Sequence, residues 1–176
     1  LLLGGCGCSG YNTMVSQDQN VKSMWGNVQS DYQRRSDLIP NLVSTVKGYA
    51  NFEQETLIKV IEQRANATKT NINVDPTKLD ANTLAQFQKT QDELGSSLSR
   101  LMVVVEKYPD LKANQNMMQL TEELTSTENK ISFSRQAYND SVTVYNTSRE
   151  TFPTNILAGM FNFKMRFAIH DAVEGT

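Results

Sequence analysis

Apolar residues recur at steps of three and four along most of the chain, which is the spacing of amphipathic α-helices packed side by side. The first such stripe comprises Val21, Trp25, Val28, Tyr32, Ile39, Leu42, Val46 and Tyr49. The stripe keeps its phase on both sides of Pro40, so we expect one long helix from about Gln17 to Gln63. Pro40 removes a backbone donor and crowds the carbonyl of Ser36, which predicts a kink rather than a stop.

Two further stripes follow a connector that has turn and cap residues but no periodicity, from Asn66 to Asn82. The second stripe is expected to begin at an N-cap, Asp80 or Asn82, and to stop at Pro109. Its members are Leu84, Phe87, Gln91, Leu94, Leu98, Leu101, Val105 and Tyr108. The third stripe ends before Pro153 and comprises Met117, Leu120, Leu124, Thr127, Ile131, Ser134, Tyr138, Ser141, Tyr145 and Phe152.

Stripes with these steps predict helices that cross at shallow angles, as in bundles and coiled coils. The predicted fold class is therefore all-α: an elongated antiparallel bundle of three to four long helices with a kinked first helix. We place the bundle domain at residues 13–163 and a C-terminal tail at residues 164–176. The first helix is about twice as long as the second, so its overhang needs cover from the connector, the C-terminal segment or another subunit. Self-association into a homo-oligomer is one expected outcome.

The first residues, 1–12, have the character of a membrane segment or a lipoprotein-signal remnant. Leu1 to Leu3 are apolar, small glycines follow, and Cys6 precedes a polar run. One interpretation is a bacterial lipoprotein signal, in which Cys6 carries the lipid. Another is a retained signal anchor whose last turns are shown, since spanning a membrane takes about 20 apolar residues. A third is a soluble protein with an apolar tail.

An apolar segment, residues 154–167, stands apart from the heptad stripes. Ile156, Leu157, Met160, Phe161 and Phe163 are concentrated there. It could cap the bundle core, pack against a neighbouring molecule or lie on a membrane surface. Core capping is our main expectation, because apolar segments are most often buried.

Composition narrows the functional classes. The chain has 176 residues, which is enough for one domain, and a net charge of −2, which argues against a nucleic-acid partner. Cys6 and Cys8 have no other ligands at metal-site spacing, and the lone His170 is assigned no role, so we expect no metal and no cofactor. No nucleophile, base and orienting group converge in one motif, and no glycine-rich phosphate loop is present, so we expect no catalytic residues.

Two extended motifs give a specific resemblance. They are Arg34-Arg35-Ser36-Asp37-Leu38-Ile39-Pro40-Asn41-Leu42-Val43 and Glu106-Lys107-Tyr108-Pro109-Asp110-Leu111-Lys112-Ala113-Asn114. Together with Tyr11-Asn12, Thr127-Glu128, Tyr138-Asn139, Tyr145-Asn146 and Phe152-Pro153, they resemble the LemA family of bacterial membrane-associated proteins. The paired cysteines before Tyr11 depart from the family pattern.

The resemblance implies a helical bundle with an N-terminal membrane segment, exposed on the extracytoplasmic side, without established enzymatic activity. It also implies a partner of the TPM-domain type or another envelope protein. The family-motif residues that we expect to be structural are Arg34, Arg35, Asp37, Pro40, Asn41, Glu106, Tyr108, Pro109, Asn114, Glu128, Tyr138, Asn139, Tyr145 and Asn146.

Arg35 lies on the seam of the first stripe, between Tyr32 and Ile39. A buried arginine needs a carboxylate or several carbonyls, which predicts a polar network with Glu128 or Glu106 that fixes helix register. The alternative is a solvated head group whose stem lies along the bundle.

The sequence favours a non-enzymatic, membrane-tethered scaffold or interaction module of the bacterial cell envelope. The alternatives are an envelope enzyme or enzyme regulator, which would need a cleft with carboxylates or a metal, and a bundle that binds a lipid or another hydrophobic ligand.

Overall fold

The computed structural model describes residues 2–49, 51–70, 80–151 and 154–169, with only the backbone described for residues 2–4 and 6. Its helices are α1 (Leu2–Lys47), α2 (Gln54–Lys69), α3 (Ala81–Val105), α4 (Pro109–Lys112), α5 (Gln115–Glu150) and α6 (Thr154–Met160). The described part of the chain contains no strand, so the all-α prediction is confirmed. Asp80 is the N-cap of α3: its side chain accepts from the Thr83 amide at 2.7 Å, and this bond lowers the pKa of the carboxyl.

The prediction of one helix from Gln17 to Gln63 was wrong at both ends. α1 begins at Leu2 and ends at Lys47, and a turn leads into the separate helix α2. Within this turn Asn51 has a φ of 68°, a left-handed conformation that ends helical structure and that asparagine tolerates better than most residues. The 46 residues of α1 give a rod of about 70 Å at ~1.5 Å per residue.

α1 continues through Pro40, as predicted, and a side chain of another helix donates to the carbonyl that the proline leaves without its helical donor. Proline has no amide hydrogen, so the carbonyl of Ser36 has no donor four residues later. The Nε of Arg64 on α2 donates to the Ser36 carbonyl at 3.0 Å. Pro40 therefore creates an acceptor on the side of α1 where α2 packs, and Arg64 uses it to tie the two helices together.

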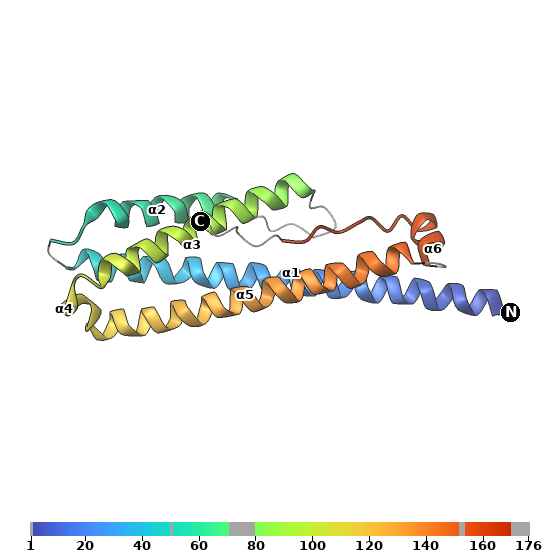
Figure 1. Cartoon of the computed structure of the whole chain (residues 1–176), viewed down its shortest axis with the longest axis horizontal. Coiled ribbons are helices and arrows are strands. Elements are labelled where there is room, and N and C mark those ends of the chain that lie inside the picture. Colours follow the sequence, from blue (N-terminus) through green and yellow to red (C-terminus); the bar gives the residue numbers. More distant parts are fainter. Residues whose placement is uncertain (1, 50, 71–79, 152–153, 170–176) are drawn as a thin grey trace.

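The four long helices form an elongated antiparallel bundle (Figure 1). α1 packs closely along α5, and α2 packs along α3. The pair α2 and α3 lies beside only one half of α1, whereas α6 lies at the other half, near the start of α1 (Figure 1). The overhang of the first helix is thus covered by α5 and by the C-terminal segment, one of the covers expected from the sequence.

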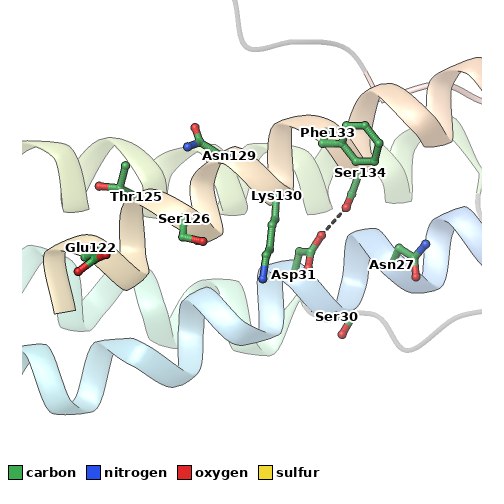
Figure 2. Close-up of a pocket in the computed structure, with 10 residues that line it drawn as sticks. All are labelled: Asn27, Ser30, Asp31, Glu122, Thr125, Ser126, Asn129, Lys130, Phe133 and Ser134. Atoms are coloured by element: carbon green, nitrogen blue, oxygen red, sulfur yellow. Dashed lines mark hydrogen bonds between the residues drawn. The ribbon is translucent and has the colours of Figure 1, made fainter. Parts of the chain in front are cut away.

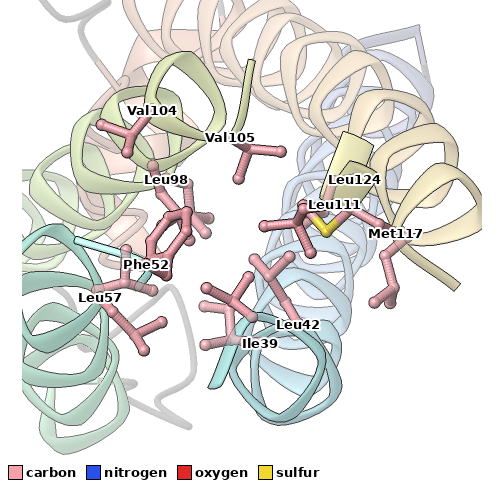
Figure 3. Close-up of a cluster of buried hydrophobic side chains, with 14 of the residues drawn as sticks. Ile39, Leu42, Phe52, Leu57, Leu98, Val104, Val105, Leu111, Met117 and Leu124 are labelled. Carbon is pink, nitrogen blue, oxygen red and sulfur yellow. The ribbon is translucent and has the colours of Figure 1, made fainter. Parts of the chain in front are cut away.

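The core has two parts, which correspond to these two halves. The aliphatic cluster fills the half where four helices meet, and Figure 3 shows its side chains converging from α1, α2, α3, α4, α5 and the turn before α2. It contains Ile39, Leu42, Val46, Phe52, Leu57, Val60, Ala67, Leu94, Leu98, Leu101, Val104, Val105, Leu111, Met117, Leu120 and Leu124. The aromatic cluster lies nearer the start of α1 and contains Met14, Val21, Trp25, Val28, Tyr32, Leu84, Phe87, Ile131, Tyr138, Val142, Tyr145 and Ile169.

The apolar segment at residues 154–167 does not cap the core in the way that we mainly expected. Ala158 is buried and Leu157 is half-buried, but Ile156, Met160 and Phe161 are exposed. After α6 the chain turns at Asn162, which has a φ of 58°, and residues 163–169 run back along α1 and α5 without helical structure. Most of these residues fall in the predicted C-terminal tail, 164–176, yet Arg166 and Ile169 are buried against the bundle.

Candidate functional site

A buried polar layer separates the two core clusters, and Arg35 is at its centre. The Arg35 side chain is only 3% exposed. Its Nη1 donates to Glu128 Oε1 at 3.1 Å, and its Nη2 donates to the main-chain carbonyl and the side-chain oxygen of Gln91 at 2.5 and 3.0 Å. Of the two predicted carboxylate partners, Glu128 makes the contact. Because Arg35, Gln91 and Glu128 belong to α1, α3 and α5, one side chain joins three helices.

The packing around Arg35 shows why it fits there. A Cβ on Gly95 would lie 3.1 Å from Arg35 Nη1, so a larger residue at this position of α3 would crowd the guanidinium. The Arg35 guanidinium carbon lies 5.0 Å from the centre of the Tyr32 ring, within the range of a cation–π contact. Glycine at position 95 gives the charged group the room to reach α3.

A second ion pair lies beside this layer. Arg135 Nη1 on α5 is 3.3 Å from Asp92 Oδ1 on α3. Burial raises the pKa of the Asp92 carboxyl, and Arg135 and Arg35 act against that rise. Residues of both pairs line an open groove between α3 and α5, together with Ser96, Ser99 and Arg100. Four of its charged groups form the pairs Arg35–Glu128 and Arg135–Asp92, so the groove is best explained as the outer edge of the register-fixing network.

Another open depression lies between α1 and α5 (Figure 2). Asn27, Ser30 and Asp31 line it from α1, and Glu122, Thr125, Ser126, Asn129, Lys130, Phe133 and Ser134 line it from α5. The Ser134 hydroxyl donates to Asp31, the contact drawn as a dashed line in Figure 2. The depression is open and most of its lining residues are polar, and the part-buried pair of Ser134 and Asp31 joins the two helices.

The most extensive polar site is a groove that holds the C-terminal segment. Asn139 Nδ2 donates to the carbonyl of Ile169 at 2.6 Å, and Asn139 Oδ1 accepts from the amide of the same residue at 2.7 Å. Asn146, two helical turns later, repeats this pairing with Arg166: its Nδ2 donates to the carbonyl at 2.9 Å and its Oδ1 accepts from the amide at 3.0 Å. A side-chain amide has one donor edge and one acceptor edge, so each asparagine binds a main-chain peptide as a neighbouring β-strand would.

Three further α5 side chains complete this backbone-binding groove. The hydroxyls of Tyr138 and Tyr145 each donate to a main-chain carbonyl at 2.9 Å, and Arg149 Nε donates to another at 2.8 Å. The acceptors are the carbonyls of Phe167, Lys164 and Phe163. Because the bonds go to the backbone, the groove recognises an extended chain more than a particular sequence.

Charge fixes the register of the bound segment. The guanidinium of Arg166 forms an ion pair with Asp18 on α1 and lies 5.4 Å from the centre of the Tyr145 ring. Asp18 is also paired with Lys22 at 3.4 Å. Burial raises the pKa of Tyr138 to about 12, with Arg166 acting in the opposite direction, so Tyr138 stays a neutral hydrogen-bond donor over the physiological range.

The remaining family-motif residues occupy the far end of the bundle or its surface. Asn114 is the N-cap of α5 and accepts from the Met117 amide at 3.2 Å, while Pro109 starts α4. The Tyr108 hydroxyl donates to the Asn51 carbonyl at 3.1 Å and its ring packs on Phe52. The exposed residues among these are Arg34, Asp37, Pro40, Asn41, Glu106, Pro109 and Asn114.

The sequence analysis placed the tyrosine and asparagine doublets of α5 among the structural residues, but it did not predict what they bind. It also did not single out Asp18, Arg149 or Arg166. The available signal was the repeat of Tyr-Asn at positions 138–139 and 145–146, seven residues apart on one helix face. A polar doublet repeated at heptad spacing indicates a line of hydrogen-bonding groups along the bundle.

Cys6 is the predicted lipidation residue. Its backbone belongs to α1, and its side chain is outside the described part of the structure. Cys8 is a free, exposed cysteine. Within the described residues no three acidic, cysteine or histidine side chains are grouped to hold a metal ion. None of the described helices is both long enough and apolar enough to cross a membrane.

The fold and its polar sites define an elongated, antiparallel helical bundle with a backbone-binding groove near one end. The chain belongs to the LemA family, whose model matches residues 24–174. It is similar to protein LemA of Metamycoplasma hominis, with 29% identity over 85% of this chain and 64% of that protein. It is also similar to magnetosome protein MamQ 2 of Paramagnetospirillum magneticum, with 25% identity over 88% of this chain and 62% of that protein. Magnetosome protein MamQ of Magnetospirillum gryphiswaldense is 22% identical over 94% of this chain and 66% of its own length. The chain thus spans less than two thirds of the length of these relatives.

Proposed function

We propose that this protein is a non-enzymatic scaffold or protein-interaction module of the LemA type in the bacterial cell envelope. It is tethered to the membrane at the start of α1, with the helical domain on the extracytoplasmic side. It self-associates and binds a partner that is a TPM-domain protein or another envelope protein. Membership of the family supports this proposal, and the apolar residues Leu1 to Leu3 followed by Cys6 support the tether.

The observation that carries the interaction role is the backbone-binding groove along α5. Asn139 and Asn146 hold a peptide through both edges of their amides, in the manner of strand addition. A bundle surface that binds an extended chain through its main chain is suited to holding protein segments in place. The chain's own residues 163–169 occupy this groove, so the same device is used to build the bundle itself.

The rival enzyme hypothesis needs ionisable groups that converge with shifted pKa values in an accessible cleft. Asp92 is the described carboxylate with a raised pKa, and Arg135 is its ion-pair partner. This arrangement supports a structural pair. The two core clusters are filled by side chains, which favours a scaffold over a bundle that encloses a hydrophobic ligand.

Gentle extraction from the native membrane, followed by intact-mass measurement and sizing, tests the proposal. We expect the protein in the envelope membrane fraction, in a complex larger than the 19.8 kDa chain. A lipoprotein would show a diacylglycerol mass on Cys6 that Cys6→Ser removes and the control Cys8→Ser retains. A retained apolar segment without that mass would show an anchor helix. A free, unmodified monomer in the soluble fraction would overturn both tether and scaffold.

A further inference from the structure

An apolar surface patch surrounds α6 at the end of the molecule where α1 starts. Met160 is 72% exposed, and Phe161 and Ile156 are each 55% exposed. Tyr11 and Met165 add further exposed apolar area from α1 and from the segment after α6. Large apolar side chains that gather on the surface mark a place where a protein meets another protein or a membrane.

The position of this α6 patch along the bundle is fixed by contacts with the first turns of α1. Leu157 of α6 packs so closely on α1 that a Cβ on Gly10 would lie 2.8 Å from Leu157 Cδ1. The Tyr11 ring packs at a tilt against Phe161 at 4.9 Å and edge-on against Phe163 at 6.0 Å, measured between ring centres. The patch is therefore level with residues 10 and 11 of α1.

Both forms of the proposed tether bring the bilayer surface to the same height. A lipid on Cys6 would hold that residue at the membrane, and an anchor helix would leave the membrane near Gly4 to Cys6. Along a helix at ~1.5 Å per residue, Cys6 and Gly10 are only about 6 Å apart. Apolar faces of interfacial helices are buried about 5–10 Å into the boundary between head groups and acyl chains. The α6 patch is within that reach of the membrane in either case.

We propose that the α6 patch rests on the lipid surface as a second membrane contact beside the tether. This inference rests on the proposed function, because the tether sets the height of the patch. Its residues suit an interface: Phe161 and Tyr11 are aromatic, Ile156, Met160 and Met165 are aliphatic or thioether side chains, and the exposed Lys164 adds a cation beside them. Two separated contacts hold the bundle at a fixed angle to the membrane, whereas a single flexible tether leaves the angle free.

α5 offers a matched comparison site. Phe133 is 75% exposed, at least as much as any residue of the patch, but it adjoins Ser134, which contacts Asp31 of α1. Asp31 lies 21 residues beyond Gly10 along α1, which at ~1.5 Å per residue places Phe133 about 30 Å farther along the bundle. If membrane contact depends on the distance from the tether along the bundle, position 160 should contact lipid and position 133 should not.

The test attaches an environment-sensitive fluorophore to the full chain through Met160→Cys or, as the control, Phe133→Cys. The background carries Cys8→Ser, and Cys6→Ser as well if Cys6 is found without lipid. The protein is reconstituted into phosphatidylcholine and phosphatidylglycerol vesicles, and vesicle attachment is measured separately by flotation. We expect the label at position 160 to shift its emission to the blue and to be quenched by lipids with brominated acyl chains. The label at position 133 should do neither.

Three results would overturn the second contact, and they differ in what they say of the tether. Vesicle-bound protein with an aqueous label at position 160 would remove the second contact and leave the tether intact. Protein that does not float with vesicles would remove both. A label at position 160 that becomes shielded without lipid, increasingly with protein concentration, would show that a second copy of the chain covers the patch instead.

Discussion

The two halves of this bundle are held together by different means. In the half with four helices, the aliphatic cluster relies on non-directional packing of leucine, isoleucine and valine. In the half nearer the start of α1, α2 is absent, and α5 contributes tyrosines together with the small polar residues Ser134 and Ser141. There the extended segment 163–169 takes the place of a missing helix and is fixed by hydrogen bonds to α5. Where too few helices remain to enclose a core, hydrogen bonds to the backbone of an extended segment replace part of the hydrophobic packing.

The largest effect should come from truncating a leucine in the half with four helices. We expect Leu101→Ala to lower the free energy of unfolding by about 3–5 kcal/mol and Leu84→Ala, in the aromatic cluster, by about 2–3 kcal/mol. Leu101 is fully buried among four helices, whereas Leu84 lies at the first turn of α3, where the surroundings can collapse into the cavity. Urea unfolding measures both. Equal losses would contradict the difference between the halves.

The aromatic half should weaken selectively in alkali. The pKa of Tyr138 is raised by burial to about 12, from 10.0 in an exposed tyrosine. Both states are protonated below pH 10, but between these two values only the unfolded chain loses the proton. Stability should therefore fall by about 2–3 kcal/mol as the pH rises from 10 to 12.

Tyr138→Phe is the control for this pH dependence. It loses the bond to the Phe167 carbonyl and starts less stable, yet its unfolding free energy should fall less steeply over the same range. Identical pH slopes in the two proteins would show that Tyr138 is not the group responsible.

Replacing Arg35 in the polar layer between the two clusters should lower the free energy of unfolding. Arg35→Met removes the donor to the Gln91 side-chain oxygen and a second donor to the Gln91 carbonyl, and we expect a loss of about 1–3 kcal/mol. Glu128→Gln is the milder control, because Glu128 is 46% exposed and water can solvate it. Full stability and unchanged assembly of Arg35→Met would exclude a register-fixing role.

The smallest effect concerns the bond that ties α2 to Pro40 on α1. Arg64→Met should cost about 0.5–1.5 kcal/mol, since the Ser36 carbonyl loses its donor. In a Pro40→Ala background the restored amide can serve that carbonyl, so the same Arg64→Met change should cost less. A double-mutant cycle measures this coupling, and strictly additive losses would mean that the two positions are independent.

The sequence predicted the helices and their buried faces far better than it predicted their connections. Every member of the first stripe from Val21 to Val46 is buried, because burial follows directly from apolar periodicity. The turn between α1 and α2 was missed because Val46 and Leu57 keep a helical phase across it. Among the described residues of the turn, Asn51 adopts a left-handed conformation, which the hydrophobic pattern does not predict.

The Arg35 network could be predicted and the backbone-binding groove could not. A buried cation on an apolar stripe requires a carboxylate or several carbonyls, so Glu128 was a natural candidate. The partners of Asn139 and Asn146, in contrast, are main-chain atoms, which every residue carries. An extended segment without periodicity gives no sign of where it binds.

Native-state hydrogen exchange at single residues tests most directly whether the C-terminal segment is an integral part of the bundle. The amides of Arg166 and Ile169 donate to Asn146 and Asn139, so both should be protected although they lie outside any helix. Asn146→Ala should release the Arg166 amide and Asn139→Ala the Ile169 amide, whereas Asn129→Ala, at an exposed position of α5, should release neither. If these two amides exchange in the unaltered protein as fast as in an unstructured peptide, the backbone-binding groove does not hold the segment in solution.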